Sequence, residues 1–313
     1  MKIEKQLNGA NLLLDKDDES SYSATELLQM SDELKSFVLD NADRFANRPI
    51  KSIEFRGSKF NVAVTNRFWF WEDLQSGKWE ALTFDVFDKY LDKETIFLDV
   101  GGWIGSTLFY AAQKVKKAVV FEPDPIAFAE LNANLKLNHD SNWHSHCETI
   151  KAAVAPEAGK VKIGFRTSGG DSMSSVLLSD SLNSKEVEAM SLSEFIKDRD
   201  LKDEKLFVKM DVEGFEYDIL PSLKSLIQTL PSATFHVSLH PQFLLDKLAE
   251  EIGRSKFKTS IIRKRFFEKH QSLLNSFKGY ECTFINGKPF NSRKELVKAL
   301  ITGQFCRDLV FSR

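Results

Sequence analysis

The sequence predicts an α/β fold, in which a mostly parallel sheet carries helices on both faces. From Ala81 onward, short apolar runs typical of buried strands alternate with segments whose apolar residues recur at helical spacing. Strands that alternate with helices pair in parallel, because each crossover helix returns the chain to the same edge of the sheet. The 313 residues, 42% of them hydrophobic, suffice for one large domain or two small ones.

The period of the apolar residues places the individual elements. Residues 1–20 form an irregular polar start, an amphipathic helix covers residues 24–47, and a hairpin covers residues 51–79. Strands are expected at 95–100, 118–123, 148–154, 159–165, 205–212 and 233–240, and helices at 81–91, 106–117, 127–138, 191–200, 218–230, 256–270 and 291–301. We therefore expect an N-terminal helical and hairpin extension (1–80), a central α/β domain (81–245) and a helical C-terminal extension (246–313).

Charge and cysteine content narrow the class of protein. The formal net charge is -2, so the composition gives no global attraction to nucleic acid, and no nucleic-acid partner is expected. Cys147, Cys282 and Cys306 are far apart and outside any CxxC spacing, which argues against disulfides and thiolate metal sites. No apolar stretch is long enough for a signal peptide or a transmembrane helix, so a cytoplasmic location is expected.

The stretch FLDVGGWIGS, residues 97–106, joins a predicted strand to a predicted helix through a glycine-rich turn. Gly101, Gly102 and Gly105 allow a ligand to approach the backbone closely. The helix that follows offers free N–H groups to an anion, while Asp99, just before the turn, can hold a cation. An α-amino acid group carries both of these charges.

A second acid, Glu122, ends the next predicted strand, about twenty residues later. A carboxylate at this place can accept both hydroxyls of a ribose. Nucleoside and amino acid together indicate S-adenosylmethionine. An NAD(P)-dependent oxidoreductase is less favoured, because Trp103 occupies the place of the second glycine of G-x-G-x-x-G, and no P-loop lysine follows the turn. The alternative is that the glycines only form a tight turn and Glu122 is a solvated strand end.

The stretch KMDVEGFE, residues 209–216, is the best source of a catalytic base. Period-two alternation places Asp211 and Glu213 on one side, together with Lys209. We expect Asp211 to be the first choice of base for an acceptor hydroxyl, followed by Glu213 and His240. Alternatively, Glu213 and Glu216 stabilise the N-terminus of the helix that they open. The oxygens of these acids and His240 could also hold Mg²⁺ or Mn²⁺, but no metal site is expected, because no HxxE or paired-histidine spacing is present.

Three stretches, FLDVGGWIGSTLFYAA, VVFEPDPIAFAELNANLKLN and LFVKMDVEGFEYDIL, resemble the FkbM family of S-adenosylmethionine-dependent methyltransferases, in order and in spacing over residues 80–241. The resemblance implies a class I methyltransferase (Rossmann-like) fold. It also implies O-methylation of a hydroxyl on a sugar, glycan or natural-product scaffold, with a small molecule or glycan as acceptor. The cofactor contacts that it implies are Asp99, Gly101, Gly102, Trp103, Gly105, Glu122 and Asp211.

The sequence departs from the family pattern at two positions. Gly102 stands where many relatives carry alanine, and Ser238 stands where relatives usually carry the glutamate of Glu-x-His. The missing glutamate is the one feature that favours another hypothesis, a methyltransferase-like binding module without catalysis. The Gly/Ser loop 167–175 is either a lid over the site or a plain surface loop, and the aromatic residues 68–71 are expected to pack in the core.

Overall fold

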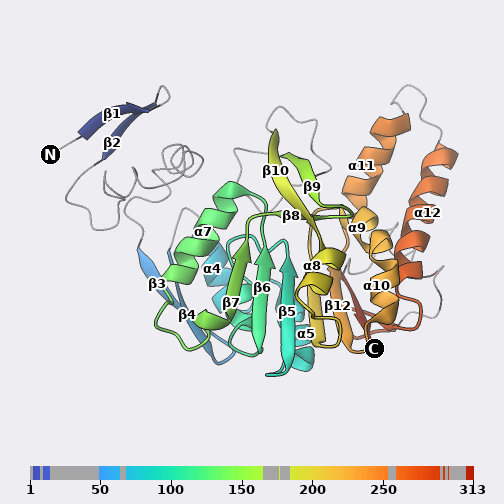
Figure 1. The fold of residues 1–313 in the computed structure, drawn as a ribbon, viewed down its shortest axis with the longest axis horizontal. Coiled ribbons are helices and arrows are strands. Elements are labelled where there is room, and N and C mark those ends of the chain that lie inside the picture. Colours follow the sequence, from blue (N-terminus) through green and yellow to red (C-terminus); the bar gives the residue numbers. More distant parts are fainter. Residues whose placement is uncertain are drawn as a thin grey trace.

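A computed structural model of the chain (Figure 1) describes residues 3–7, 10–14, 49–63, 68–164, 176, 184–252, 259–289, 292, 295 and 308–313. Its main sheet has seven strands in the order β13-β14-β12-β11-β5-β6-β7. These strands are β5 (Thr95–Val100), β6 (Lys117–Phe121), β7 (Cys147–Ile150), β11 (Lys205–Met210), β12 (Ala233–Ser238), β13 (Glu281–Phe284) and β14 (Asp308–Ser312). Strands β7, β6, β5, β11 and β12 pair in parallel, which confirms the predicted mostly parallel sheet.

Helices cover both faces of this sheet, because its central strands are apolar on both sides. In β5, Leu98 points into the core on one face and Phe97 into the core on the other. The first face is covered by α8 (Leu192–Asp198), α9 (Glu216–Ser222), α10 (Lys224–Thr229), α11 (Pro241–Ile252) and α12 (Thr259–Ser276). The second is covered by α4 (Phe68–Gln75), α5 (Ala81–Tyr90), α6 (Leu108–Ala111), α7 (Pro125–Lys136) and the hairpin of β3 (Ile50–Phe55) and β4 (Ser58–Ala63).

The order of the strands fixes where a ligand can bind. From β5 the chain continues to β6 and β7 on one side, and then crosses to β11 and β12 on the other. The carboxyl ends of β5 and β11 therefore flank the point where the strand order reverses. In open α/β sheets a crevice forms at this point, because the connections leave in opposite directions.

The C-terminal extension differs from the expected all-helical segment. Its first part is helical, in α11 and α12, but β13 and β14 add two strands to the main sheet. Strand β14 is antiparallel to both β12 and β13. Its residues Leu309, Val310 and Phe311 are all buried, and a short continuous apolar run lacks the alternation that identifies a strand.

Smaller differences concern single elements. The aromatic run 68–71 belongs to helix α4 and not to the hairpin, and the strand predicted at 148–154 is divided into β7 and β8 (Ala153–Ala155). Strand β8 pairs with β10 (Ser184–Ser191), which also pairs with β9 (Gly159–Gly164). In the predicted polar start, β1 (Ile3–Leu7) and β2 (Ala10–Leu14) form an antiparallel pair. The helix predicted at 24–47 and the loop 167–175 lie outside the described residues, and so does the helix predicted at 291–301 except for residues 292 and 295.

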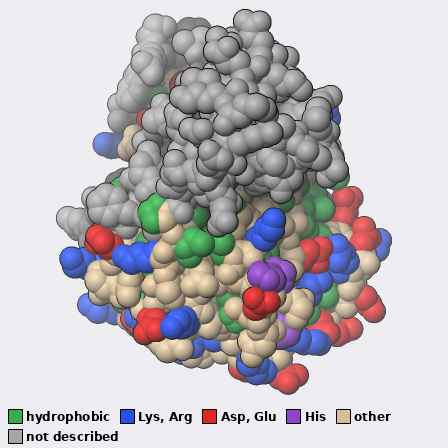
Figure 2. Space-filling view, turned by 90° about the vertical axis from the view of Figure 1, so that its left-hand side faces the viewer, with side chains coloured by type: hydrophobic (Ala, Val, Ile, Leu, Met, Phe, Trp, Pro, Cys, Tyr) green, Lys and Arg blue, Asp and Glu red, His purple; other side chains and the backbone are tan. Residues whose placement is uncertain are grey.

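Among the described residues on the face shown in Figure 2, charged side chains of both signs are interspersed. Over the described part of the chain, several charged side chains form ion pairs between elements; Lys117 and Arg199, for example, lie 2.7 and 2.8 Å from Glu148. Exposed pairs of this kind each contribute about 0 to 1 kcal/mol to stability. Among the described helices, none is both long and apolar enough to cross a bilayer.

Candidate functional site

The glycine-rich turn after β5 packs tightly against its neighbours. Gly101 and Gly105 have φ angles of 89° and 93°, which favour glycine. A side chain at Gly101 would overlap the carbonyl oxygen of Asp211, and one at Gly102 would overlap the side chain of Val120 in β6. The packing of the protein itself therefore requires these glycines, whether or not a ligand also approaches them.

Asp99, near the end of β5, is fully buried and is held by other side chains. Its Oδ2 accepts a hydrogen bond from Thr107 Oγ1 at 2.6 Å, and its Oδ1 lies 3.7 Å from Lys209 Nζ. Burial raises the pKa of Asp99, and Lys209 and the hydrogen bond from Thr107 oppose this rise. Because it is fully buried, Asp99 can influence a ligand only through these neighbours.

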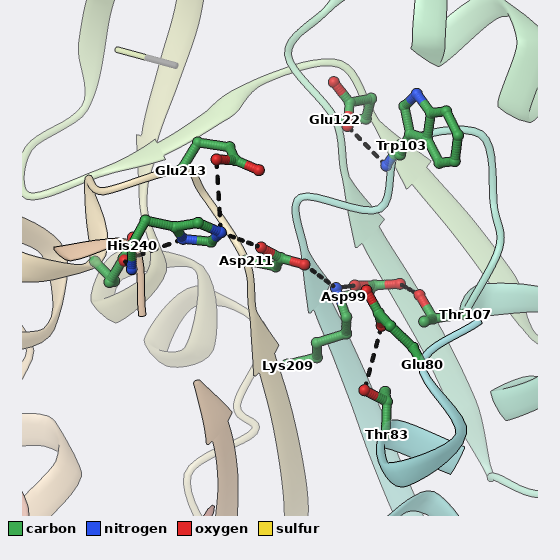
Figure 3. A network of polar contacts seen from close by, with 11 residues as sticks. Glu80, Thr83, Asp99, Trp103, Thr107, Glu122, Lys209, Asp211, Glu213 and His240 are labelled. Carbon is green, nitrogen blue, oxygen red and sulfur yellow. Dashed lines mark hydrogen bonds and ion pairs between the residues drawn. The ribbon is translucent and has the colours of Figure 1, made fainter. Parts of the chain in front are cut away.

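Lys209, in β11, lies at the centre of a group of carboxylates (Figure 3). Its Nζ is 3.3 Å from Asp211 Oδ2, and the side chain is almost fully buried. Burial lowers the pKa of Lys209, but the carboxylates of Asp211, Asp99 and Glu80 outweigh it and raise that pKa. In return, the cation overcomes the effect of burial on Asp211 and lowers the pKa of that carboxyl group. Lys209 and Asp211 are therefore both ionised at neutral pH.

Glu80 reaches the same group from the second face of the sheet (Figure 3). It precedes α5 in a left-handed conformation, with φ of 43°, and its Oε2 accepts a hydrogen bond from Thr83 Oγ1 at 3.2 Å. Protein around the carboxylate reduces its hydration and raises the pKa of Glu80 to about 7, with Lys209 opposing the rise and Asp211 adding to it.

Glu122 follows β6 and faces the turn from the other side. Its Oε2 accepts the backbone N–H of Trp103 and its Oε1 accepts that of Asp124, both at 2.8 Å. Burial, followed by the neighbouring charge of Asp124, raises the pKa of Glu122 to about 8. Each carboxylate oxygen can accept a further hydrogen bond, so Glu122 can still accept hydroxyl groups of a ligand.

His240, two residues after β12, lies among three acidic side chains (Figure 3). Its Nε2 is 3.5 Å from Asp211 Oδ1 and 3.5 Å from Glu213 Oε2. Its Nδ1 is 3.2 Å from Glu216 Oε1, which also accepts the backbone N–H of His240 at 2.7 Å. Burial lowers the pKa of His240, but these three carboxylates outweigh it and raise the pKa to about 9.

A cavity of about 380 Å³ joins these groups at the carboxyl ends of β5 and β11. This volume lies within the range of small-molecule sites. The expected site residues that line it are Gly101, Trp103, Glu122, Asp211, Glu213 and His240. Asp99, Gly102 and Gly105 are not among its lining residues. Trp69, Phe70 and Trp79 form an aromatic part of the wall, whereas Trp71 is buried in the core as expected.

Sequence reasoning missed two acidic residues of the cavity, Glu80 and Asp308. Asp308 begins β14, a strand that the sequence did not predict, and in the register of the sheet it is the partner of Ser238. The only feature of the sequence that could have indicated Glu80 as a site residue is its position directly before the helix predicted at 81–91. The role of Glu216 was also missed: it is fully buried and binds the N–H groups of Gly214 and His240.

The charge of the cavity restricts its ligands. Among the described lining residues, Lys209 is the one lysine or arginine, and the carboxylates are Glu80, Glu122, Asp211, Glu213 and Asp308. Burial raises the pKa values of Glu80 and Glu122 to about 7 and about 8, but the acidic side chains still outnumber Lys209 and His240, so the wall suits a cationic ligand better than the pyrophosphate of a dinucleotide. The donor set therefore fits S-adenosylmethionine, which carries an ammonium and a sulfonium group, better than it fits NAD.

Comparisons with known proteins agree with this chemistry. The family model of the methyltransferase FkbM domain matches residues 99–276, which is more than half of the chain. No curated protein sequence matches the chain significantly. The solved structures to which the chain is similar include methyltransferase FkbM from Methylobacillus flagellatus, with 12% identity and a TM-score of 0.39, over 80% of this chain and 56% of that one. The chain thus spans just over half the length of that protein.

Two further similar structures contain a cofactor or its product. One is a Streptococcus mutans protein assigned as a methyltransferase, in complex with SAH (S-adenosylhomocysteine). It has 10% identity and a TM-score of 0.37, over 74% of this chain and 97% of that one. The other is TYW2 from M. jannaschii in complex with AdoMet, with 13% identity and a TM-score of 0.34 over 86% of this chain and 87% of that one. The match of the family model to more than half of the residues shows that the chain belongs to the FkbM family of S-adenosylmethionine-dependent methyltransferases.

Proposed function

We propose that the protein methylates a hydroxyl group of a sugar, glycan or natural-product scaffold in the cytoplasm. The observation that supports this most directly is the convergence of Asp211, Glu213 and His240 at one end of the cavity. A hydroxyl nucleophile must lose its proton during methyl transfer; the carboxylates of Asp211 and Glu213 can accept it, and the positively charged His240 pairs with both of them. The residues Cys147 and Cys282 are free thiols, which suits a reducing compartment.

The cofactor is proposed to lie along the cavity from Glu122 to Lys209. Glu122 would accept hydroxyl groups of the ribose, and the backbone near Gly101 and Trp103 would lie beside the amino acid part. Of the acids near Lys209, Glu80 is better placed than Asp99 to pair with the ammonium group, because Glu80 lines the cavity and Asp99 is buried behind it. Asp99 would then act by holding Lys209 and Thr107 in place.

The chain's own residues would mainly orient the reactants and remove one proton. Bound S-adenosylmethionine supplies an activated methyl group, whose carbon–sulfur bond breaks as the acceptor oxygen bonds to the carbon. Alignment of the two reactants accounts for much of the rate of such a displacement. The carboxylate of Asp211 would receive the hydroxyl proton. Lys209 keeps that carboxylate ionised and contacts its Oδ2, whereas its Oδ1 lies toward His240.

The two alternative functions receive less support. An oxidoreductase would have to place a pyrophosphate against a wall whose acidic side chains outnumber its basic ones. Only Ser238, at the position of the family's glutamate, favoured a binding module without catalysis. Asp308 lies directly opposite Ser238 on β14 and lines the same cavity. The cavity therefore retains a carboxylate beside this position.

Titration calorimetry with S-adenosylhomocysteine (SAH) and with NAD tests the cofactor site. We expect micromolar binding of SAH and none of NAD, and we expect Glu122→Ala to weaken SAH binding at least tenfold, because it removes the acceptors of two ribose hydroxyls, each hydrogen bond contributing about 0.5 to 1.5 kcal/mol. Glu157→Ala, an exposed position in the turn before β9, is the matched control and should bind SAH normally. Methyl transfer from labelled S-adenosylmethionine to a panel of polyols and glycans then tests the acceptor class. A protein that binds SAH but methylates only amines would contradict the proposal.

A further inference from the structure

Three side chains at one end of the cavity have the composition and the spacing of a metal site. One ligand atom each from Asp211, Glu213 and His240 can be chosen so that all three lie within 4.8 Å of one another. His240 Nε2 is 3.5 Å from a carboxylate oxygen of each acid. Ligands around a small divalent ion lie about 2.0 to 2.2 Å from it, hence roughly 3 to 4 Å apart. A contraction of about 1 Å would therefore complete the site.

The surroundings of His240 hold its ring in the orientation that a metal ligand needs. The buried Glu216 accepts the backbone N–H of His240 and contacts its Nδ1, so that Nε2 points to Asp211 and Glu213 (Figure 3). Histidine ligands of metals usually donate their second ring N–H to a carboxylate or carbonyl in this way. Glu216 is fixed in turn by the N–H of Gly214 at 2.8 Å. The orienting carboxylate thus comes from α9, and the histidine follows β12.

The charge of this end of the cavity also calls for a cation. Asp211, Glu213 and Glu216 contribute three carboxylates around His240, whose proton offsets one of their charges, and the next cation, Lys209, is shared with Asp99 and Glu80. A divalent ion that replaces the proton on His240 Nε2 would supply one more positive charge. Carboxylates that are largely removed from water need compensating charge. Glu213 has a φ of 51°, a strained conformation for a residue with a side chain, and its side chain lines the cavity.

We propose that Asp211, Glu213 and His240 bind one divalent cation, of the Mn²⁺ type, at the acceptor end of the cavity. Two carboxylates favour a hard ion, and an imidazole makes Mn²⁺ a better match than Mg²⁺ or Ca²⁺. Three protein ligands leave coordination positions that face the cavity. There the ion would bind the oxygen of an acceptor hydroxyl and lower its pKa; this role, but not the binding of the ion itself, rests on the proposed function.

Titration of the unmodified protein with Mn²⁺, followed by electron paramagnetic resonance, tests the site. The signal of free aqueous Mn²⁺ should decrease to an end point of one ion per chain, with micromolar affinity. Glu213→Gln should weaken binding at least tenfold, and the exposed control Glu157→Gln should leave it unchanged. Glu216→Gln, which loosens His240 without removing a ligand, should weaken binding about tenfold. Absence of stoichiometric binding by the unmodified protein would overturn the proposal.

A second measurement separates this proposal from the proposed function. SAH should bind to Glu213→Gln with near-normal affinity, which also shows that the variant is folded. If SAH binds to the unmodified protein and Mn²⁺ does not, the metal site is wrong and His240 is itself the cation of the cluster. If Mn²⁺ binds and SAH does not, the metal site stands and the methyl-transfer assignment fails. Equal Mn²⁺ binding by Glu213→Gln and the unmodified protein would place the ion elsewhere and refute the assignment.

Discussion

The two ends of the cavity are built in different ways. The end proposed for the cofactor is local: a single turn between β5 and α6 supplies Gly101 and Trp103, and Glu122 follows the next strand. The acceptor end is assembled from residues far apart in the chain, such as Asp211 and His240. The first is held mainly by close packing and backbone hydrogen bonds, and the second mainly by charge. Changes at the two ends should therefore have different consequences.

The largest effect is expected from Asp211→Asn at the acceptor end. The amide keeps the shape of the side chain and can still accept a hydrogen bond from Lys209, but it cannot take up a proton. We expect turnover of an identified acceptor to fall about 100- to 10,000-fold, the usual contribution of a general base. Calorimetry should show SAH affinity within threefold of that of the unmodified protein. If affinity and turnover fall together, Asp211 belongs to the cofactor end, and the division between the two ends is wrong.

The two ends also differed in how well the sequence predicted them. The strand, the glycines and Glu122 lie in short stretches whose pattern is visible locally, so their grouping was expected. The contact of Glu216 with His240 was not, because it depends on how α9 and β12 lie in space. Asp308 could not be placed, since an apolar run as short as Leu309–Phe311 gives no strand signal. The sequence also predicted only part of the reason why these positions need glycine. Val120 and Asp211, which are distant from the turn in sequence, leave no room for a side chain at Gly102 and Gly101.

At the cofactor end, Gly102→Ala tests whether packing fixes the turn. Many relatives carry alanine at this position, but here the added methyl group would overlap Val120. We expect a loss of about 2 kcal/mol in the free energy of unfolding, typical of overpacking. In a double-mutant cycle with Val120→Ala, the two changes should be coupled favourably, because the smaller side chain makes room for the methyl group. Additive losses in urea denaturation would show that Val120 does not set the requirement for glycine.

The smallest effect concerns the support of the acceptor end by α12. His270, in α12, is neutral and buried: its Nδ1 donates to the carbonyl of Phe266 at 2.8 Å, and its Nε2 accepts from Tyr217 in α9 at 2.9 Å. Burial lowers the pKa of His270 from 6.5 to about 4. Below pH 6.5 the unfolded chain binds a proton that the folded chain excludes, so stability is complete above this pH and declines as the pH falls toward 4.

At pH 5.5, relative to pH 7, this one histidine should cost about 1.2 kcal/mol of the free energy of unfolding, in addition to a similar contribution from the buried His236, whose pKa burial lowers to about 3. In urea denaturation at both pH values, His270→Gln should reduce the acid-induced loss, and the exposed control His139→Gln should leave it unchanged. The glycine-rich turn, residues 97–106, contains no histidine, so this loss should act on the contact between α9 and α12 and not on that turn. If His270→Gln retained the full acid-induced loss, the contact between α9 and α12 would not be the pH-sensitive support of the acceptor end.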